Sequence, residues 1–202
     1  MATDLGLFPL GIVVLPGEKV PLHIFEPRYR ELVGECLEGE TPFGILLTDD
    51  DGLRALGTKV RIVEVLERFE DGRLVIIVEG TERFRLLELT EGRSFHTGQV
   101  EDVEDVRAPA EESARQQAVE LFEELRDAVG AEVDLPDVAD PELSWAICRR
   151  IEIDARTKQV LLESRSERDR IDFLTGHLRS ASAQLALVQE HTAAARRNGN
   201  LR

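Results

Sequence analysis

The hydrophobic pattern of the chain changes its period near residue 108, and this change constrains the fold more than any other feature of the sequence. Before it, short apolar runs rich in β-branched residues are separated by Pro and Gly turn signals, which is typical of strands. After it, apolar residues recur at intervals of three and four, which indicates helices. The sequence therefore predicts an α+β protein with a β-rich subdomain at 1–107, an α-helical subdomain at 108–195 and a flexible basic tail at 196–202.

The first half predicts six or seven short strands, a number and spacing that favour a small twisted barrel or a folded-over sheet. Asp71-Gly72 lies between two β-branched runs and predicts a hairpin with a type I′ turn. Pro21 confines its strand to a sheet edge or a bulge. A helix is predicted at 27–37, because Pro27 suits the first helical position and apolar residues follow at helical spacing. The strands are expected at 19–25, 41–48, 59–69, 73–80, 83–90 and 94–103.

The second half predicts a helix from Pro109 to Gly130, two short helices near 140–147 and 154–164, and a long final helix. Ser164 and Glu167 have the spacing of a capping box before that final helix. The final helix carries an apolar seam at alternating intervals of three and four residues. Either the seam packs on its own subdomain, or part of it pairs with another chain. Its members are Ile171, Leu174, Leu178, Ala181, Leu185 and Val188.

The charge and the cysteines exclude several classes of protein. The net charge is −15 and both halves are acidic, which disfavours nucleic acid and anionic lipid as partners. No apolar run approaches the roughly 20 residues that span a bilayer, and the N-terminus lacks the features of a signal peptide. Cys36 and Cys148 are far apart and form neither a disulfide framework nor a zinc motif. Two reduced thiols fit a cytoplasmic protein.

No motif in the sequence supports a catalytic, metal or cofactor site. Residues 52–59 nearly match a phosphate-binding loop, but Thr58 and Lys59 stand in the wrong order and a strand follows where a helix is needed. The acidic run at 49–51 lacks the bidentate Glu of a calcium loop. The four histidines have no partner at metal-ligand spacing, and no serine lies in a GxSxG motif. We therefore expect no catalytic residues, no metal and no cofactor.

The stretch FPLGIVVLPGEKVPLHIFEPRYREL, residues 8–32, resembles the start of the Lon protease N-terminal domain. The matching features are Phe-Pro-Leu at 8–10, Leu-Pro-Gly at 15–17, a strand ending in Ile-Phe-Glu at 24–26, and Pro-Arg-Tyr opening a helix at 27–29. The aromatic residue often found before Pro-Gly in the family is absent here. Gly-Thr-Glu-Arg-Phe at 80–84 matches the Gly-x-x-Arg-Phe of the family, and the order of the remaining segments agrees over nearly the whole chain.

The resemblance implies a β-rich, PUA-like pseudo-barrel followed by a helical bundle. It further implies a stand-alone substrate-binding domain that recognises protein or peptide segments without ATPase or peptidase activity of its own. On this basis we expect an adaptor in protein quality control, with polypeptide clients and a separate ATP-dependent protease as partners, and with self-association through the final helix. Two alternatives stay open at this point: a PUA-like RNA-binding module, which the acidic charge disfavours, and an uncatalogued hydrolase.

The residues HIFEPRYREL, at 23–32, form a corner where a strand enters a helix. Pro27 fits the first turn, Arg28 is placed to pair with Glu26, and Tyr29 suits the boundary between sheet and helix. The corner is either architectural or part of a ligand site. For a peptide site, the candidates are exposed aromatics and the charge beside them, and the alternative for each aromatic is the ordinary core. These candidates are Phe25, Arg28, Tyr29, Phe69 and Phe84.

Overall fold

The computed structural model describes residues 3–199, with side chains described up to Gln189. The chain forms two compact units. Unit 1 holds the chain up to Asp105 together with Ile151–Ser164, and unit 2 holds Val106–Arg150 together with the chain from Arg165 onward. Each unit therefore combines segments that are separated in the sequence. The subdomain limits expected from the sequence, 1–107 and 108–195, remain a prediction about independent folding.

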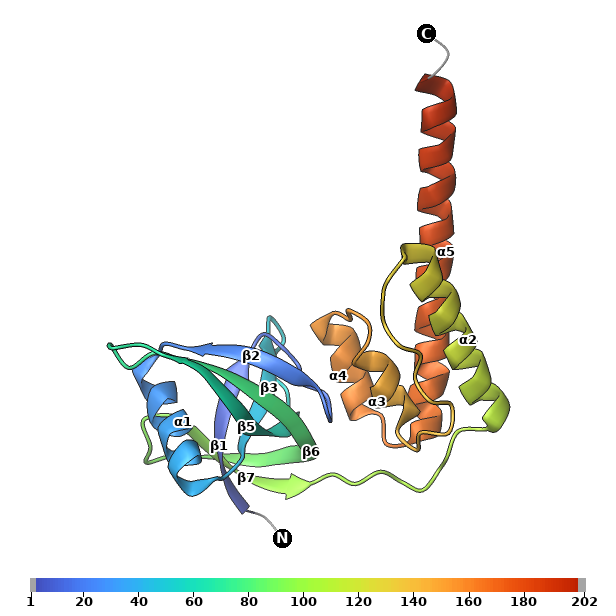
Figure 1. Ribbon diagram of the computed structural model, residues 1–202. Coiled ribbons are helices and arrows are strands. Elements are labelled where there is room, and N and C mark those ends of the chain that lie inside the picture. Colours follow the sequence, from blue (N-terminus) through green and yellow to red (C-terminus); the bar gives the residue numbers. More distant parts are fainter. Residues whose placement is uncertain (1–2, 200–202) are drawn as a thin grey trace. The chain divides into compact units, whose positions relative to one another are not determined.

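The strands of unit 1 form a seven-stranded sheet that closes on itself. Neighbouring strands follow the order β1, β7, β6, β5 and β3, and β3 pairs back with β1 (Figure 1). The β1–β3 pair is parallel and the other pairs are antiparallel. This ring confirms the predicted α+β fold with an N-terminal pseudo-barrel. The strands are β1 (Thr3–Leu10), β2 (Lys19–Ile24), β3 (Phe43–Asp49), β4 (Gly52–Leu53), β5 (Leu56–Arg68), β6 (Leu74–Thr90) and β7 (His96–Asp102).

Helix α1 (Pro27–Gly39) begins at the predicted proline and packs its apolar stripe against the inside of the ring. The ring of Tyr29 is 3% exposed and stacks on Phe8 with 3.8 Å between ring centroids. The helix ends at Gly39, and the C-cap residue that follows it is Glu40, whose φ of 49° lies in the left-handed region. Among the residues described, Glu40 is the only non-glycine with a positive φ.

The β5–β6 hairpin turns at the predicted Asp71-Gly72, but its turn is not of type I′. A type I′ turn needs positive φ at both central residues, whereas in this turn only Gly72 has one, at 83°. The N–H of Gly72 donates to the carbonyl of Phe69 at 3.0 Å, and the N–H of Phe69 donates to the carbonyl of Arg73 at 2.9 Å. This is the longer hairpin loop, in which a type I turn is followed by a left-handed glycine.

Strand β6 is one strand of 17 residues where the sequence suggested two. Its first half pairs with β2 and its second half with β7, while β5 runs along the opposite edge. Gly80 lies between the two halves, and in the sequence it indicates the end of the first of two strands. In the structure its N–H donates to the carbonyl of Glu18 at 2.9 Å and its carbonyl accepts from Gly17 at 2.8 Å, so the ladder continues.

Helix α4 (Ala155–Glu163) belongs to unit 1, although it follows helices of unit 2 in the chain. Buried Arg83 donates to the carbonyls of Leu162, at 2.8 Å, and Ser164, at 2.6 Å, and also forms an ion pair with Asp105. Gln159 donates to the carbonyl of Leu56 at 3.1 Å. The Gly-x-x-Arg-Phe motif is thus architectural here, because its arginine holds the end of α4 against β6.

Unit 2 consists of α2 (Glu112–Val129), α3 (Leu143–Cys148) and α5 (Glu167–Gly199). Arg170 is 1% exposed, and its guanidinium donates to Ser144 at 2.9 Å and pairs with Glu167 at 3.1 Å. A buried charge needs such partners, so this cluster holds α3 against α5. The cap of α5 is Ser166, which accepts from the N–H of Asp169 at 3.1 Å, and not the predicted Ser164.

The apolar seam of α5 is divided between buried and exposed positions. Ile171, Leu174 and Leu178 are fully buried, whereas Leu185 is half-buried and Val188 is 61% exposed. Figure 1 shows α5 continuing well past the end of α2. Residues 200–202 of the predicted basic tail lie outside the described residues. Among the helices described, none combines the length and the apolar character that crossing a membrane requires.

Candidate functional site

The candidate site is the outward side of three adjacent strands, β2, β6 and β5. Directly opposite residues of an antiparallel pair point to the same side of a sheet. The register therefore gives two rows across these strands, Pro21–Ile77–Glu64 and His23–Val75–Glu67. Each residue on this side is exposed or half-buried, while the residues that alternate with them in β2 and β6 pack into the core. We call this surface the outer face, which consists of Lys19, Pro21, His23, Phe25, Arg61, Glu64, Glu67, Phe69, Arg73, Val75, Ile77 and Glu79.

Two β-bulges in β5 place its charged residues on the outer face. Arg61, Glu64 and Glu67 are each three residues apart, so a regular strand would point Glu64 away from the other two. The register shifts between Ile62 and Glu64 and again between Val65 and Glu67, each time by one extra residue. Bulges re-aim side chains in this way. All three charged residues consequently lie opposite outer-face residues of β6.

Aromatic side chains gather at the hairpin end of the outer face. The imidazole of His23 lies 5.9 Å from the ring of Phe25 and 6.1 Å from the ring of Phe69, measured between centroids. The guanidinium of Arg73 covers the ring of Phe69 at 4.8 Å. Phe25 is 61% exposed and Phe69 is half-buried. A cluster of aromatic side chains that is partly open to solvent marks a surface suited to contact with another molecule.

The structure separates the predicted site residues into two groups. Phe25 and Phe69 lie on the outer face and are brought together by His23. Arg28 is exposed at the start of α1, where it pairs with Glu26 at 2.7 Å and covers the Tyr29 ring at 4.7 Å. Tyr29 is buried among core residues, and burial raises the pKa of its hydroxyl. Phe84 is fully buried in a second core cluster. The rings of Tyr29 and Phe84 are therefore not accessible to a ligand in this conformation.

The free edge of β2 is poorly suited to adding a strand from a ligand. Among the strands described, β2 pairs only with β6. Since the N–H of Gly80 donates to Glu18, the alternation of the ladder turns the backbone groups of Lys19, Pro21 and His23 toward the free edge. Pro21 has no N–H, and proline at such a position blocks pairing with a further strand. A ligand is therefore better accommodated on the face than along this edge.

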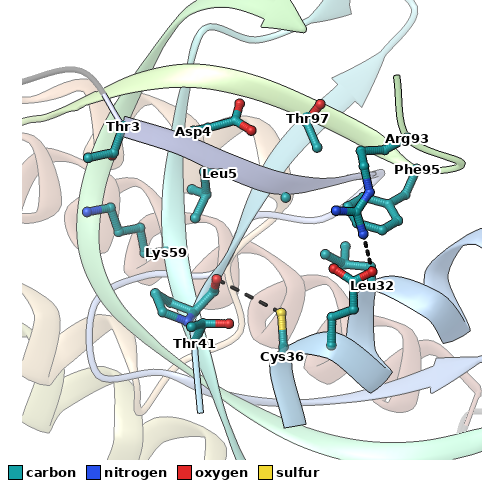
Figure 2. A pocket seen from close by; sticks show the side chains of 13 residues that line it. Thr3, Asp4, Leu5, Leu32, Cys36, Thr41, Lys59, Arg93, Phe95 and Thr97 are labelled. Atoms are coloured by element: carbon teal, nitrogen blue, oxygen red, sulfur yellow. Dashed lines mark hydrogen bonds and ion pairs between the residues drawn. The ribbon is translucent and has the colours of Figure 1, made fainter. Parts of the chain in front are cut away.

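Unit 1 also contains a pocket of about 370 Å³ between α1 and β1, shown in Figure 2. Arg93 pairs with Glu35 and lies 4.7 Å above the ring of Phe95. Lys59 pairs with Asp102 at 2.5 Å and with Glu82 at 3.6 Å. Both cations of the pocket are thus neutralised by carboxylates of the protein itself.

The pocket offers no activated nucleophile. The thiol of Cys36 points toward the carbonyl of Pro42 at 4.0 Å (Figure 2). Burial raises the pKa of this thiol, which disfavours the reactive thiolate. The hydroxyl groups that line the pocket belong to threonines, and that of Thr97 bonds to Thr90 at 2.6 Å. Within the described residues, no group of His, Cys, Asp and Glu is arranged to hold a metal ion.

Sequence reasoning missed most of the outer face. The sequence shows His23 only as one of four histidines without a partner at metal-ligand spacing, and no motif singles out Glu64 or Glu67. The alternation of Val75, Ile77 and Glu79 with buried neighbours was a usable signal for one strand. The contribution of β5 carried no such signal, because the bulges break its two-residue period.

Comparison with known proteins identifies the domain. The family described as "ATP-dependent protease La (LON) substrate-binding domain" matches residues 4–180. A Lon protease of Paraburkholderia phytofirmans is 28% identical over 194 residues, which cover 88% of this chain and 24% of that protein. Lon protease 1 of Hydrogenovibrio crunogenus is 24% identical over 194 residues, with 88% and 23% covered. The chain thus spans about a quarter of the length of these curated relatives.

Two solved structures agree with this match. A Lon N-terminal domain protein from Xanthomonas campestris has a TM-score of 0.67 and 28% identity, covering 86% of this chain and 98% of that one. The N-terminal domain of a Mycobacterium avium complex Lon protease has a TM-score of 0.61 and covers 87% and 98%, and at 19% identity it supports the fold alone. From its sequence, its β-ring and these matches, the chain belongs to the LON substrate-binding domain family.

Proposed function

We propose that this protein is a non-catalytic recognition module that binds unfolded polypeptide segments, and that the outer face is the surface that binds them. The observation that carries the proposal is the aromatic cluster of Phe25, His23 and Phe69, in which Phe25 is 61% exposed, on a domain of the LON substrate-binding family. Aromatic side chains supply much of the binding energy in protein recognition. Unfolded segments expose the apolar side chains that such a cluster contacts.

The proposal extends to an adaptor role in the cytoplasm, in which a separate ATP-dependent protease degrades what this protein captures. Two observations support a role without catalysis. The matched family is the substrate-binding part of a protease, and the cations of the pocket are already paired within the protein. The two cysteines are buried and unbridged, as in proteins of a reducing compartment.

Fluorescence anisotropy with labelled, permanently unfolded peptides tests the binding surface. We expect the wild type to bind apolar peptides at micromolar concentrations and a Phe25→Ala/Phe69→Ala variant to bind about tenfold more weakly. A Leu87→Ala/Leu89→Ala variant is the matched control, since these leucines are 50% and 53% exposed elsewhere on β6. An equal loss of peptide affinity in both variants would show that the outer face is not the binding site. No binding by the wild type at ~100 μM would refute peptide recognition itself.

Two further experiments test the absence of catalysis and the adaptor role. We expect the purified protein to hydrolyse neither casein nor ATP, and turnover of either would show that it is an enzyme. We also expect capture of client proteins from native cells to be lost with Phe25→Ala/Phe69→Ala, and client turnover to slow when this variant replaces the wild type. Unchanged client turnover in cells would contradict the adaptor role.

A further inference from the structure

Resting on the function proposed above, we infer that the outer face selects polypeptide segments in which Lys or Arg flanks the apolar residues, and that Glu64 and Glu67 bind these cations. The inference concerns the charge preference of the face, which peptide binding alone does not determine. It follows from which charges on this face are already paired, and from where the unpaired ones lie.

Three of the other four charged residues on the outer face are already in ion pairs, and the fourth is Lys19, which lies opposite Glu79 in the row farthest from the hairpin end. Arg61 pairs with Glu79 at 2.6 Å, in the row at one end of the face. Arg73 pairs with Asp71 at 2.8 Å, at the hairpin end. Glu64 and Glu67, by contrast, have no ion pair with any residue that the structure describes.

These two carboxylates border the apolar part of the face directly. Glu64 lies opposite Ile77, and Glu67 lies opposite Val75 in the adjoining row. Directly opposite residues have Cβ atoms about 5 Å apart. A ligand side chain that contacts Val75 or Ile77 therefore lies close to the carboxylate of Glu67 or Glu64. A ligand that covers the apolar side chains therefore brings its neighbouring side chains to Glu64 and Glu67.

The spacing of the carboxylates fits an extended polypeptide. Successive rows of one sheet face are separated by two residues of strand, or about 6.8 Å. Side chains on one side of an extended ligand recur at the same interval. The bulge at Leu66 is what places Glu64 and Glu67 in adjoining rows on the same side. Basic side chains two residues apart in a ligand thus match the two carboxylates.

Charge also excludes competing occupants. Phosphate backbones and acidic segments are repelled by carboxylates that lack partners. Polypeptide segments that carry both apolar and cationic side chains can contact the apolar residues of the face and pair with Glu64 and Glu67.

The test uses three unfolded peptides with one apolar core and with flanks of Lys, Gln or Glu. We expect the affinity order Lys, Gln, Glu, with roughly tenfold between the extremes at low salt and less at high salt, because exposed ion pairs are weak and screened. A Glu64→Gln/Glu67→Gln variant should lose the order. A Glu88→Gln/Glu91→Gln variant, which changes the net charge equally at exposed positions elsewhere, should keep it.

Each outcome decides a different claim. Equal binding of the three peptides, or an order that survives in Glu64→Gln/Glu67→Gln, overturns the charge preference while peptide recognition stands. If Glu88→Gln/Glu91→Gln also loses the affinity order, net charge selects the ligand and these two carboxylates do not. That result also overturns the inference. No binding of any peptide by the wild type refutes the proposed function, and the inference with it.

Discussion

Arg83 and Ser164 are separated by 81 positions in the sequence, yet Nη1 of Arg83 donates to the carbonyl oxygen of Ser164 at 2.6 Å. The same nitrogen donates to Leu162, and the side chain is 5% exposed. Replacing Arg83 by Ala leaves these carbonyls and Asp105 without their common donor. We expect the free energy of unfolding to fall by about 3 kcal/mol in urea titrations.

The matched control for Arg83 is Arg85→Ala. Arg85 lies on the same strand, is about half exposed, and pairs with Glu101 at 3.5 Å. An exposed pair of this kind contributes about 0–1 kcal/mol. If both variants lost the same stability, the contacts of Arg83 with the end of α4 would not be the reason for its effect.

Gly57 is required because two strands approach closely at its position. A Cβ there would lie 2.3 Å from the carbonyl oxygen of Ile45 and 2.6 Å from a side-chain carbon of Leu46. We expect Gly57→Ala to destabilise unit 1 by about 2 kcal/mol or more, since the obstacle is backbone that cannot move aside. Gly11→Ala is the control, because a Cβ there meets nothing within 4 Å. Thermal unfolding of the two variants would show the difference, and a wild-type midpoint for Gly57→Ala would contradict it.

Glu40 adopts a backbone conformation that suits glycine better. Its φ is 49°, and it stands at the C-terminal end of α1, where a negative charge is also unfavourable. We expect Glu40→Gly to stabilise the protein by about 1 kcal/mol. The control Glu38→Gly, inside the last turn of the helix, should destabilise it by a similar amount. Denaturant midpoints measure both, and a loss of stability in Glu40→Gly would be the contrary result.

Asp154 caps helix α4 and makes its stability depend on pH. A hydrogen bond from the Thr157 hydroxyl, and then one from the Thr157 N–H at 3.0 Å, lower the pKa of Asp154 below its ordinary 3.8. A depressed pKa means that the carboxylate stabilises the folded state above about pH 4, and that this contribution is lost as the pH falls through the folded pKa.

We therefore expect Asp154→Ala to lower stability by about 1 kcal/mol at pH 7 and by less at pH 3. Urea midpoints at several pH values measure the difference between variant and wild type. Asp50→Ala, at an exposed aspartate in a turn, should show a smaller difference at pH 7. A constant difference for Asp154→Ala from pH 7 to pH 3 would contradict the role of its charge.

The exposed end of the α5 seam predicts self-association. Leu185 continues the spacing of the buried Ile171, Leu174 and Leu178 but is only half-buried. We expect sedimentation of the wild type at ~100 μM to show dimers, and Leu185→Asp to shift them to monomers with little change in thermal unfolding. Gln184→Asp changes an exposed neighbour and should leave the dimers intact. A wild type that sediments as a monomer would mean that the seam serves only its own unit.

Most of the secondary structure could be predicted from the sequence, because it depends on local patterns. Pro27 and Gly130 mark a helix start and a helix end where expected. The prediction of two strands in place of β6 was wrong at Gly80, because a glycine inside a strand cannot be told from a glycine in a turn by sequence. The hydrogen bonds of Gly80 to Glu18 and Gly17 join it to the turn before β2, which is far away in the chain, and no local pattern reports them.

The candidate site was less predictable than the fold. Phe25 could be selected as an exposed aromatic, but Tyr29 and Phe84 have the same chemistry and are buried. Glu64 and Glu67 could not be placed on one face, because a strand without bulges would separate them. A bulge depends on how two strands pair, so the sequence of either strand alone does not determine its position.

The return of Ile151–Ser164 to unit 1 has a consequence for how the protein matures during translation. When β6 leaves the ribosome, the carbonyls that Arg83 binds have not yet been synthesised. The ring can close early, but the helix that rests on it arrives only after Val106–Arg150 has emerged. Ribosome-bound chains that stop before Ile151 will therefore hold Arg83 without these acceptors, and unit 1 is completed only after Val106–Arg150 of unit 2 has been synthesised.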